Sequence, residues 1–493
     1  MTNLAERLTG AVWGHLVGDA MGVPYEFQDA SAIGEVRWGE QGTYGQSPGT
    51  WSDDGALMLA LLDSLLETGF DTDDQGRRAL AWYREGRYTP DGDGHFDIGN
   101  ATREALLGIE RGTPAEHAGP AHEQAGGNGS LMRILPVALV GHAAPAEVLV
   151  EQAHRASKVT HGHARPQVAC ALYVLVARRL LTGAGGRAKA LAGARKELRA
   201  LYESHPLGGE FLSALEHLEG WTERQGRGRV WDSSWSAWEA FAGAHSYQET
   251  VERAIGYGND TDTTAAIAGG LAGIRWGIGG IPVEWLDGMR GKDIVAPFIA
   301  RLLEHGGYKT DQLRVDWVEL ATAPGLAQAP GALGMTFLPG KRGAGRAGLH
   351  WRNLEADAAT LRGVHQANTL LVLVEDHELE SAGVRRLDAV MHSHDVELLR
   401  HPIVDGGVPP DAASYGVLLD GLRSRIEAGQ RVVVACMGGL GRTGTAVSAL
   451  LVDAGMDAES AIDLTRRTRP GAIENWEQEE FVRRWQDQRR RSP

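Results

Sequence analysis

Cysteine is scarce in this 493-residue sequence, which contains only Cys170 and Cys436. Two cysteines cannot build the disulfide framework of a small secreted protein, so we expect the reducing environment of the cytoplasm. No run of about 18 apolar residues occurs, and the sequence therefore predicts neither a membrane-spanning helix nor a membrane partner. An apolar N-terminal stretch with basic flanks is also missing, and we expect no signal peptide.

Basic residues are in the minority, with 49 Lys and Arg against 64 Asp and Glu. The resulting net charge of −15 argues against general affinity for nucleic acid. Apolar residues make up 43% of the chain, which is enough for complete folding. A chain of this length exceeds one ordinary hydrophobic core, so two or more domains are expected.

Two regions differ in their patterns. Residues 1–305 have recurrent helical spacing and almost no strand-like alternation, which predicts an all-α domain. Residues 306–328 are polar and contain Pro and Gly, and we interpret them as a linker. In residues 329–493, strand-like segments alternate with helical ones, which predicts an α/β domain with a mainly parallel central sheet. The strand-like segments are 335–341, 369–376 and 431–439.

The stretch from Gly256 to Gly273, GYGNDTDTTAAIAGGLAG, carries the first candidate site. Asp260 and Asp262 flank one threonine, and Thr263 follows. On an extended or turn segment both carboxylates would point the same way and could bind one hard cation together with the hydroxyl. An equally open alternative is that aspartate only caps the helix that follows. That helix has almost no side-chain bulk, so we expect it to be buried against close neighbours.

A second acidic pair lies far upstream in Ser52-Asp53-Asp54, again just before an apolar helical run. Adjacent carboxylates repel each other unless a cation or another partner compensates their charge. Two such pairs, each at the start of a helix, suggest one shared binuclear site. Oxygen-only ligation favours Mg²⁺ or Mn²⁺ over zinc.

The third candidate site is the segment CMGGLGRT, which runs from a predicted strand at Cys436 into a helix. A glycine-rich loop before a helix presents backbone N–H groups to an anion and favours a thiolate nucleophile. Arg442 can grip a phosphate, and Thr443 can donate a hydrogen bond to the sulfur. Asp405, in an upstream Gly/Pro loop, fits the general acid. The loop that would contact phosphate comprises Met437, Gly438, Gly439, Leu440 and Gly441.

The alternative for Cys436 is a buried cysteine at the end of a strand, which is a common position. The loop glycines and the arginine six residues later argue against it. Cys170, in CALYVLVARRLL, is by contrast expected to be a core residue of a helix.

About the first 300 residues resemble the ADP-ribosylglycohydrolase family. The motifs are GDAMG (18–22), WSDDG (51–55), FDIGNATREAL (96–106), GGNGSLMR (126–133), THGHARPQVAC (160–170) and GNDTDTTAAIAGGLAG (258–273). The resemblance implies an all-α fold, two Mg²⁺ or Mn²⁺ ions, and removal of ADP-ribose from a modified side chain. The implied metal ligands are Ser52, Asp53, Asp54, Asp260, Asp262 and Thr263.

The same motifs supply candidates for acid–base catalysis and substrate binding. Asp97 and Glu26 are the acid–base candidates, because hydrolysis at an anomeric carbon needs a nearby carboxylate. Asp97 could instead cap the next helix, and Glu26 could be a surface loop residue. The candidate contacts to ADP-ribose are Gly99, Asn100, Gly127, Asn128, Gly129, Ser130 and His161. The glycines could equally serve only the turn, and the histidine could be structural.

About the last 165 residues resemble dual-specificity protein phosphatases, nearest to the cyclin-dependent-kinase-associated branch. The motifs are TFLPGK (336–341), LVEDHEL (373–379), HPIVDGGVP (401–409), CMGGLGRTG (436–444) and RPGAIENWEQEEFV (469–482). The resemblance implies phosphate monoester hydrolysis through a cysteinyl-phosphate, without a cofactor. One departure is Ala435, which stands where the family usually has a histidine that orients the loop and tunes the thiolate.

Together these observations predict a bifunctional hydrolase acting on an ADP-ribosylated protein and on a phosphorylated substrate. One alternative is that the first domain hydrolyses small ADP-ribose derivatives while the second acts on a nucleotide or sugar phosphate. Another is that one domain only binds ADP-ribose or phosphate, and Ala435 makes this alternative less remote for the second domain.

Overall fold

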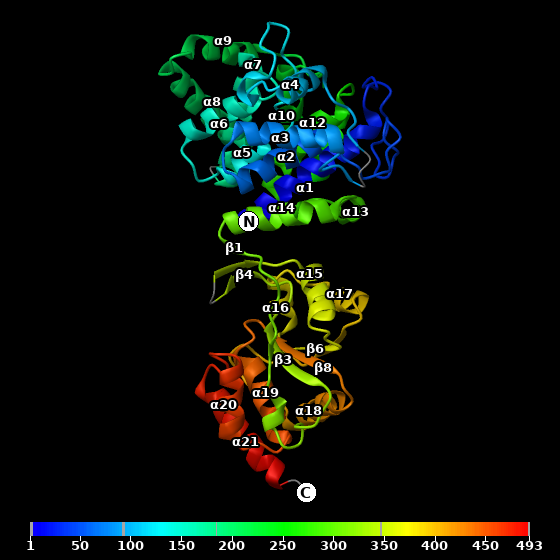
Figure 1. Cartoon of the computed structure of the whole chain (residues 1–493), viewed down its shortest axis with the longest axis vertical. Coiled ribbons are helices and arrows are strands. Elements are labelled where there is room, and N and C mark those ends of the chain that lie inside the picture. Colours follow the sequence, from blue (N-terminus) through cyan, green and yellow to red (C-terminus); the bar gives the residue numbers. More distant parts are fainter. Residues whose placement is uncertain (1–2, 91–93, 184, 346–347, 492–493) are drawn as a thin grey trace. The chain divides into compact units, whose positions relative to one another are not determined.

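The computed structural model describes residues 3–90, 94–183, 185–345 and 348–491. The chain forms two compact units, Met1–Gly306 and Gly307–Pro493 (Figure 1). Within the described residues, no helix combines the length and apolarity needed to cross a bilayer.

The first unit is helical, as predicted. Its α-helices are α1 Leu4–Gly22, α2 Asp53–Glu67, α3 Thr72–Glu85, α4 Asn100–Glu110, α5 Leu135–Val140, α6 Ala146–Lys158, α7 Ala164–Leu181, α8 Arg187–Glu203, α9 Gly208–Gly220, α10 Val230–Gly243, α11 Tyr247–Ile255, α12 Thr261–Trp276, α13 Val283–Gly288 and α14 Lys292–His305. Helix α3 contains few apolar residues, and the side chain of Asp71 caps its start. Its last turn ends at a left-handed glycine, Gly86.

Helices α1 and α12 pack with their backbones in near contact. On α1, Gly10, Gly14 and Gly18 recur at every fourth residue and so share one face. The atoms nearest to them on α12 belong to Gly273, Gly269 and Ala265, so the helices run antiparallel. A Cβ atom on Gly14 would lie 2.5 Å from the carbonyl oxygen of Gly269, which is closer than real Cβ atoms approach.

This packing places the end of α1 beside the start of α12. A Cβ atom on Gly22 would lie 2.3 Å from the Cα of Asp262. The expectation that the small-residue helix is buried and allows close approach is confirmed, since every residue of α12 from Thr261 to Ile274 is buried. The glycines on α1 form the surface against which the small residues of α12 pack.

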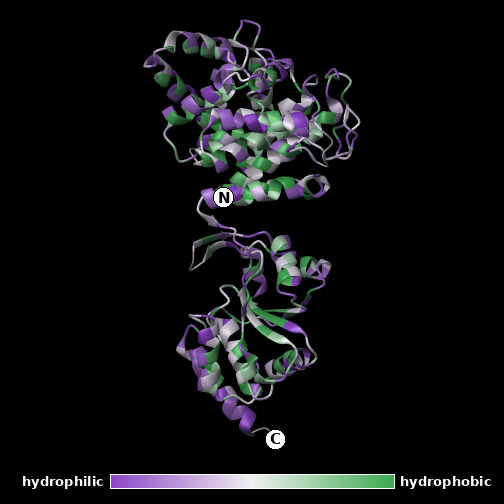
Figure 2. Ribbon diagram, viewed as in Figure 1, coloured by the Kyte–Doolittle hydropathy of each residue, from purple (hydrophilic) through white to green (hydrophobic). Residues whose placement is uncertain are grey.

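The second unit is an α/β domain with a mainly parallel sheet, as predicted. The five-stranded sheet has the order β2 Asp316–Trp317, β3 Ala332–Phe337, β8 Arg431–Cys436, β6 Thr369–Val372 and β7 Glu397–Arg400. Only β2 is antiparallel to its neighbour. Its inner strands carry hydrophobic residues, which are green in Figure 2.

A smaller sheet has the order β1 Tyr308–Lys309, β5 Gly348–Trp351 and β4 Arg342–Gly345. The α-helices of this unit are α15 Leu354–Ala359, α16 Asp376–Ser381, α17 Leu387–Ser393, α18 Ala412–Glu427, α19 Gly441–Asp453, α20 Ala458–Thr468 and α21 Trp476–Arg491.

Residues 306–328, interpreted above as a linker, are built into the second unit from Gly307 onward. Strand β1 pairs with β5, and β2 pairs with β3. Ala323 and Leu326 are buried in the hydrophobic core of this unit. A strand of two residues is too short to show the alternation of polar and apolar side chains that identifies a strand in a sequence. The pattern of this segment therefore resembled a linker.

The close contact between α1 and α12 predicts that Gly14→Ala destabilises the first unit by about 3 kcal/mol, because the new methyl group overlaps the backbone of α12. The matched control is Gly209→Ala, a helical glycine whose Cβ would meet nothing within 4 Å. The control should leave stability unchanged or raise it by up to about 1 kcal/mol. Calorimetric unfolding measures both, and equal effects of the two substitutions would refute the packing account.

Candidate active sites

The two acidic pairs of the first unit meet in space. Asp53 and Asp54 are the first residues of α2, and Asp262 and Thr263 lie in the first turn of α12. The hydroxyl of Thr263 donates to Asp54 Oδ2 at 3.1 Å and joins the two helix starts. Ser52 caps α2, because its side chain accepts from the N–H of Asp54 at 3.2 Å.

Asp260 does not serve as a helix cap, which was the alternative role. It occupies the N-cap position of α12, but its side chain makes no capping hydrogen bond. Its Oδ2 instead accepts from Asn128 Nδ2 at 2.8 Å. The same amide group donates to Ser233 Oγ at 2.9 Å. Asp262 is helical rather than extended, so the two carboxylates converge through a helix start and not through an extended segment.

Asp19 is a buried residue of this cluster that the sequence analysis did not single out. It is fully buried on α1, and its two carboxylate oxygens accept from the N–H groups of Ser52 at 2.9 Å and Gly55 at 2.7 Å. These bonds fix the start of α2, where Asp53 and Asp54 lie. A carboxylate within an apolar helix, inside the GDAMG motif, was the available signal.

The two acid–base candidates join this cluster. Asp97 adopts a positive φ of 59° and does not cap α4, whose N-cap is Gly99. Tyr44, which the sequence reasoning missed, donates its hydroxyl to Asp97 Oδ1 at 2.7 Å. Glu26 is 5% exposed, so it is not a surface residue. Glu26, Asp97 and Asp262 each offer an oxygen within 4.8 Å of the others.

Burial and the proximity of other carboxylates raise the pKa values of the acidic residues in this cluster. Burial, followed by the charges of Asp97 and Asp260, raises the pKa of Glu26 to about 9. Burial raises the pKa of Asp19 to about 7 and that of Asp262 well above its usual range. A proton or a cation must compensate this charge.

The donor set fits a hard divalent cation. Three buried carboxylate oxygens have no hydrogen-bond partner among the described residues: Glu26 Oε2, Asp54 Oδ1 and Asp262 Oδ2. Oxygen-only donors favour Mg²⁺ or Mn²⁺, whereas zinc sites draw on nitrogen and sulfur. The cluster therefore suits the predicted metal site.

The predicted ADP-ribose contacts fall into two groups. Gly99 and Asn100 are exposed at the start of α4, close in sequence to Asp97. Ser130 instead points into the core, toward the hydroxyl of Ser157 at 2.8 Å. The amide of Asn128 is used inside the protein, to hold Asp260.

His161 lies beneath the glycine loop. A Cβ atom on Gly129 would lie 2.8 Å from its ring, and one on Gly127 would lie 3.3 Å away. The ring bonds to Thr160 Oγ1 at 2.9 Å, and burial lowers its pKa to about 3. A neutral, covered imidazole supports the loop, and its contact with a ligand stays a prediction.

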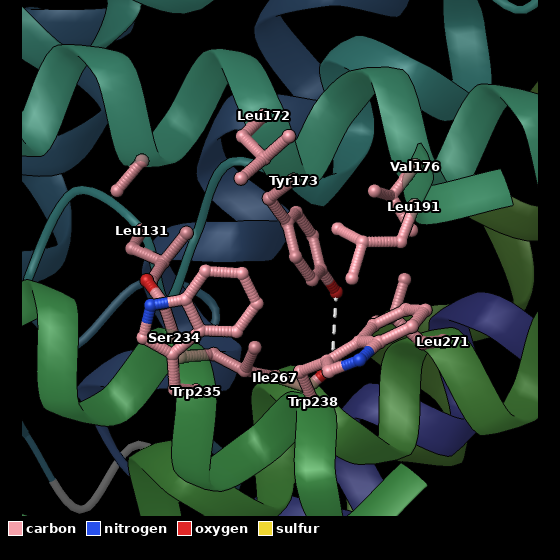
Figure 3. A pocket seen from close by; sticks show the side chains of 11 residues that line it. Leu131, Leu172, Tyr173, Val176, Leu191, Ser234, Trp235, Trp238, Ile267 and Leu271 are labelled. Carbon is pink, nitrogen blue, oxygen red and sulfur yellow. Dashed lines mark hydrogen bonds between the residues drawn. The ribbon is translucent and has the colours of Figure 1, made fainter. Parts of the chain in front are cut away.

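An apolar cavity lies on another side of α12 and is not a substrate site. Residues of α7, α10 and α12 line it, including Tyr173, Trp238 and Leu271 (Figure 3). Tyr173 donates its hydroxyl to the carbonyl of Ile267 at 3.1 Å, the dashed line in the figure. The cavity has a volume of about 30 Å³, which is enough for about one water molecule and far too small for ADP-ribose.

The second candidate site is the loop between β8 and α19. Cys436 ends β8, and Arg442 is the second residue of α19. The guanidinium donates twice to Glu378, at 2.6 and 2.8 Å, and once to the carbonyl of Ile403 at 2.9 Å. Asp405 Oδ1 lies 2.9 Å from Arg442 Nη2, although its side chain is 83% exposed.

Glu378 is the residue of this site that the sequence reasoning missed. Burial alone would raise the pKa of Glu378, but its hydrogen bonds to Arg442 lower it. The pair therefore stays ionised and fixes the direction of the guanidinium. The hydroxyl of Thr443 is buried without a partner among the described residues, which leaves it free for the predicted bond to sulfur.

Two residues of the C-terminal segment hold the loop. Arg469 donates to the carbonyl of Gly438 at 3.2 Å, and Glu474 accepts from the N–H of Gly441 at 3.0 Å. Gly439 has a φ of 66° and lies so close to β3 that a Cβ atom would be 2.3 Å from the carbonyl oxygen of Thr336. The glycine is therefore required by the fold of the loop.

Comparison with known proteins assigns a family model to each unit. Residues 1–312 match the model of the ADP-ribosylglycohydrolase family. Since this is more than half of the chain, the protein belongs to that family. Residues 347–482 match a phosphatase domain described as "Swiss Army Knife protein, DSP-PTPase phosphatase domain". The chain therefore joins an ADP-ribosylglycohydrolase domain to a phosphatase domain, which confirms the resemblances drawn from its motifs.

Individual relatives cover one unit each. ADP-ribosylarginine hydrolase Tri1 of Pseudomonas putida is 30% identical over 57% of this chain and 74% of its own length. Cyclin-dependent kinase inhibitor 3 of Sus scrofa is 28% identical over 28% of this chain and 65% of its own. A solved structure of an ADP-ribosylglycohydrolase-related protein complex is 31% identical, with a TM-score of 0.50. That match covers 62% of this chain and 99% of the other.

The crowding of carboxyls predicts opposite effects of Asp262→Asn without and with metal. Without metal the substitution should raise the melting temperature of the first unit, because it removes a buried negative charge from a repulsive cluster. Mg²⁺ at 100 times its dissociation constant should stabilise the wild type by about 2.7 kcal/mol and should not stabilise the variant.

The control for this experiment is Asp287→Asn, at an exposed position outside the cluster. It should melt like the wild type and keep the full Mg²⁺ response in differential scanning calorimetry. A Mg²⁺ response that survives Asp262→Asn would remove Asp262 from the metal site.

Proposed function

We propose that the first unit removes ADP-ribose from modified protein side chains and that the second hydrolyses phosphate monoesters through Cys436. The observation that carries the first part is the meeting of two acidic pairs at the starts of α2 and α12. Membership of the ADP-ribosylglycohydrolase family supports the same reading. Because the Pseudomonas relative is an ADP-ribosylarginine hydrolase, ADP-ribosyl-arginine is the first substrate to test.

Two Mg²⁺ or Mn²⁺ ions fit the first site, held by Ser52, Asp53, Asp54, Asp260, Asp262 and Thr263. Bound there, such ions supply Lewis-acid stabilisation of ribose oxygens and lower the pKa of water. Asp97 takes the proton of the attacking water; burial raises the pKa of this carboxyl, which makes it a stronger base, and the hydrogen bond from Tyr44 opposes that rise. Glu26, buried beside it, donates a proton to the departing side chain as the bond to the ribose C1 breaks.

In the second site, Cys436 Sγ attacks phosphorus while the loop N–H groups and Arg442 hold the phosphate oxygens. Asp405 protonates the departing alkoxide or phenolate. Water then attacks the cysteinyl-phosphate and gives its proton back to Asp405, and the sulfur leaves with a hydrogen bond from Thr443. Phosphate is released and the thiolate is restored.

The reaction described for the second site does not require a histidine at position 435, where this chain has alanine. Ala435 is fully buried in β8, paired in register with Thr336 on one side and Val372 on the other. Arg442, Thr443 and Asp405, which handle charge and protons, are all present around Cys436. Loss of the histidine is expected to slow the reaction and shift its pH optimum.

The two reactions should separate cleanly in single variants of the full chain. Asp260→Asn should lower release of ADP-ribose from an ADP-ribosyl-arginine peptide by a hundredfold or more, since that carboxylate is a metal ligand, and should leave phosphatase activity intact. Cys436→Ser should do the reverse, because serine is a far weaker nucleophile.

The measurement pairs chromatography of free ADP-ribose with release of p-nitrophenol from p-nitrophenyl phosphate, on one preparation with Mg²⁺ and with EDTA. Wild-type release of ADP-ribose that persists in EDTA would contradict the metal-dependent reaction. Binding of ADP-ribose without turnover of either an arginine-linked or a serine-linked peptide would favour a small ADP-ribose derivative or a non-catalytic binding role.

A further inference from the structure

The second unit contains a buried lysine that the mechanism above does not use. Lys341 follows β3 and is only 6% exposed. Its backbone is fixed on both sides, by a bond from its N–H to Leu338 and a bond from Arg352 to its carbonyl. No described residue forms a hydrogen bond or an ion pair with its ammonium group. Most of the side chain is covered, whereas its ammonium group keeps some exposure, so an anion can reach a positive charge that no described residue neutralises.

A second buried base lies next to this ammonium group. His350, on β5, is 8% exposed, and its Nδ1 has no partner among the described residues. A Cβ atom built on Gly345 would lie 2.8 Å from His350 Nε2 and 3.1 Å from Lys341 Nζ. The two nitrogens therefore flank one point, and glycine at position 345 leaves that point without a side chain.

Both bases lie at the end of the sheet that carries the catalytic loop. Phe337, the last residue of β3, pairs in register with Cys436, the last residue of β8. The ring of His350 lies 5.7 Å from that of Phe337. Burial lowers the pKa of Lys341, and the charge of Cys436 opposes this shift.

The surrounding charges leave this corner positive. Arg352 is neutralised by Asp357 through two hydrogen bonds of 2.8 and 2.7 Å. Lys309 pairs in register with His350, but its own side chain is exposed to solvent. Asp311 is the acidic residue that acts on His350, and it is largely exposed. Nothing acidic in this corner therefore pairs with Lys341 among the described residues.

We infer that Lys341 and His350 form a second anion subsite beside the catalytic loop. The inference rests on the proposed phosphatase function and narrows its substrate class. The substrate is a small phosphate monoester that carries a second phosphate group, with one phosphate on Cys436 and Arg442 and the other on Lys341 and His350. A nearly enclosed pair of bases suits a small molecule better than the surface of a protein.

The test compares matched substrates that differ by one phosphate. Adenosine 3′,5′-bisphosphate is compared with the 3′- and 5′-monophosphates, and p-nitrophenyl phosphate serves as the substrate without a second anion. The wild type should favour the bisphosphate in kcat/KM by about tenfold to a hundredfold, the usual effect of one charge-assisted contact. Lys341→Met should abolish this preference by raising KM for the bisphosphate alone.

Matched variants keep this result interpretable. Lys309→Met removes an exposed lysine from the same small sheet and should keep the preference. Lys341→Arg should restore most of it, and His350→Gln should reduce it in part. If Lys341→Met instead slows every substrate equally and raises the pH at which Cys436 is alkylated, the lysine acts on the thiol and the subsite is refuted.

A binding measurement separates failure of the subsite from failure of the enzyme. In the Cys436→Ser background, calorimetry should show that inorganic pyrophosphate binds about tenfold or more tightly than inorganic phosphate, and that adding Lys341→Met removes the difference. The difference in binding between pyrophosphate and phosphate is expected even if the protein hydrolyses no phosphate monoester. Equal binding of the two anions overturns the subsite, and a preference for a doubly phosphorylated peptide over the bisphosphate overturns the small-molecule class.

Discussion

The contact between α1 and α12 is the constraint on which the first unit depends. Glycines at every fourth position of α1 let its backbone touch that of α12. Asp19 lies in the last turn of α1, and Asp262 lies in the first turn of α12. Because the two helices are antiparallel and in contact, these two turns are neighbours. Asp19 then holds the start of α2 through two backbone N–H groups. Helix packing therefore positions the starts of α2 and α12, and Asn128 from the glycine loop holds Asp260 beside them.

The two sites handle buried charge in opposite ways. In the first unit, carboxyls are crowded together with no basic partner among the described residues, and burial and their mutual charge raise their pKa values, a cost that a cation would relieve. In the second, Arg442 is already paired with Glu378 and Asp405 and is held in place before a phosphate arrives. Lys341 has no such partner among the described residues, which is the basis for the anion subsite proposed there.

Much of the fold and of the sites followed from the sequence, for identifiable reasons. Helices such as α7 and α12 and strand β8 have long apolar patterns, and the acidic pairs stand beside helix starts. Asp19, Tyr44 and Glu378 were missed because each acts on a residue far away in the chain, and only packing reveals the contact. The strands at 308–309 and 316–317 were missed because two residues cannot show a period.

Both acidic pairs are proposed to build one binuclear metal site. Electron paramagnetic resonance of the full chain loaded with Mn²⁺ tests it directly. One site predicts two magnetically coupled ions, and either Asp53→Asn or Asp260→Asn should abolish the coupling. Two uncoupled ions, or a coupled pair that survives both substitutions, would contradict the account.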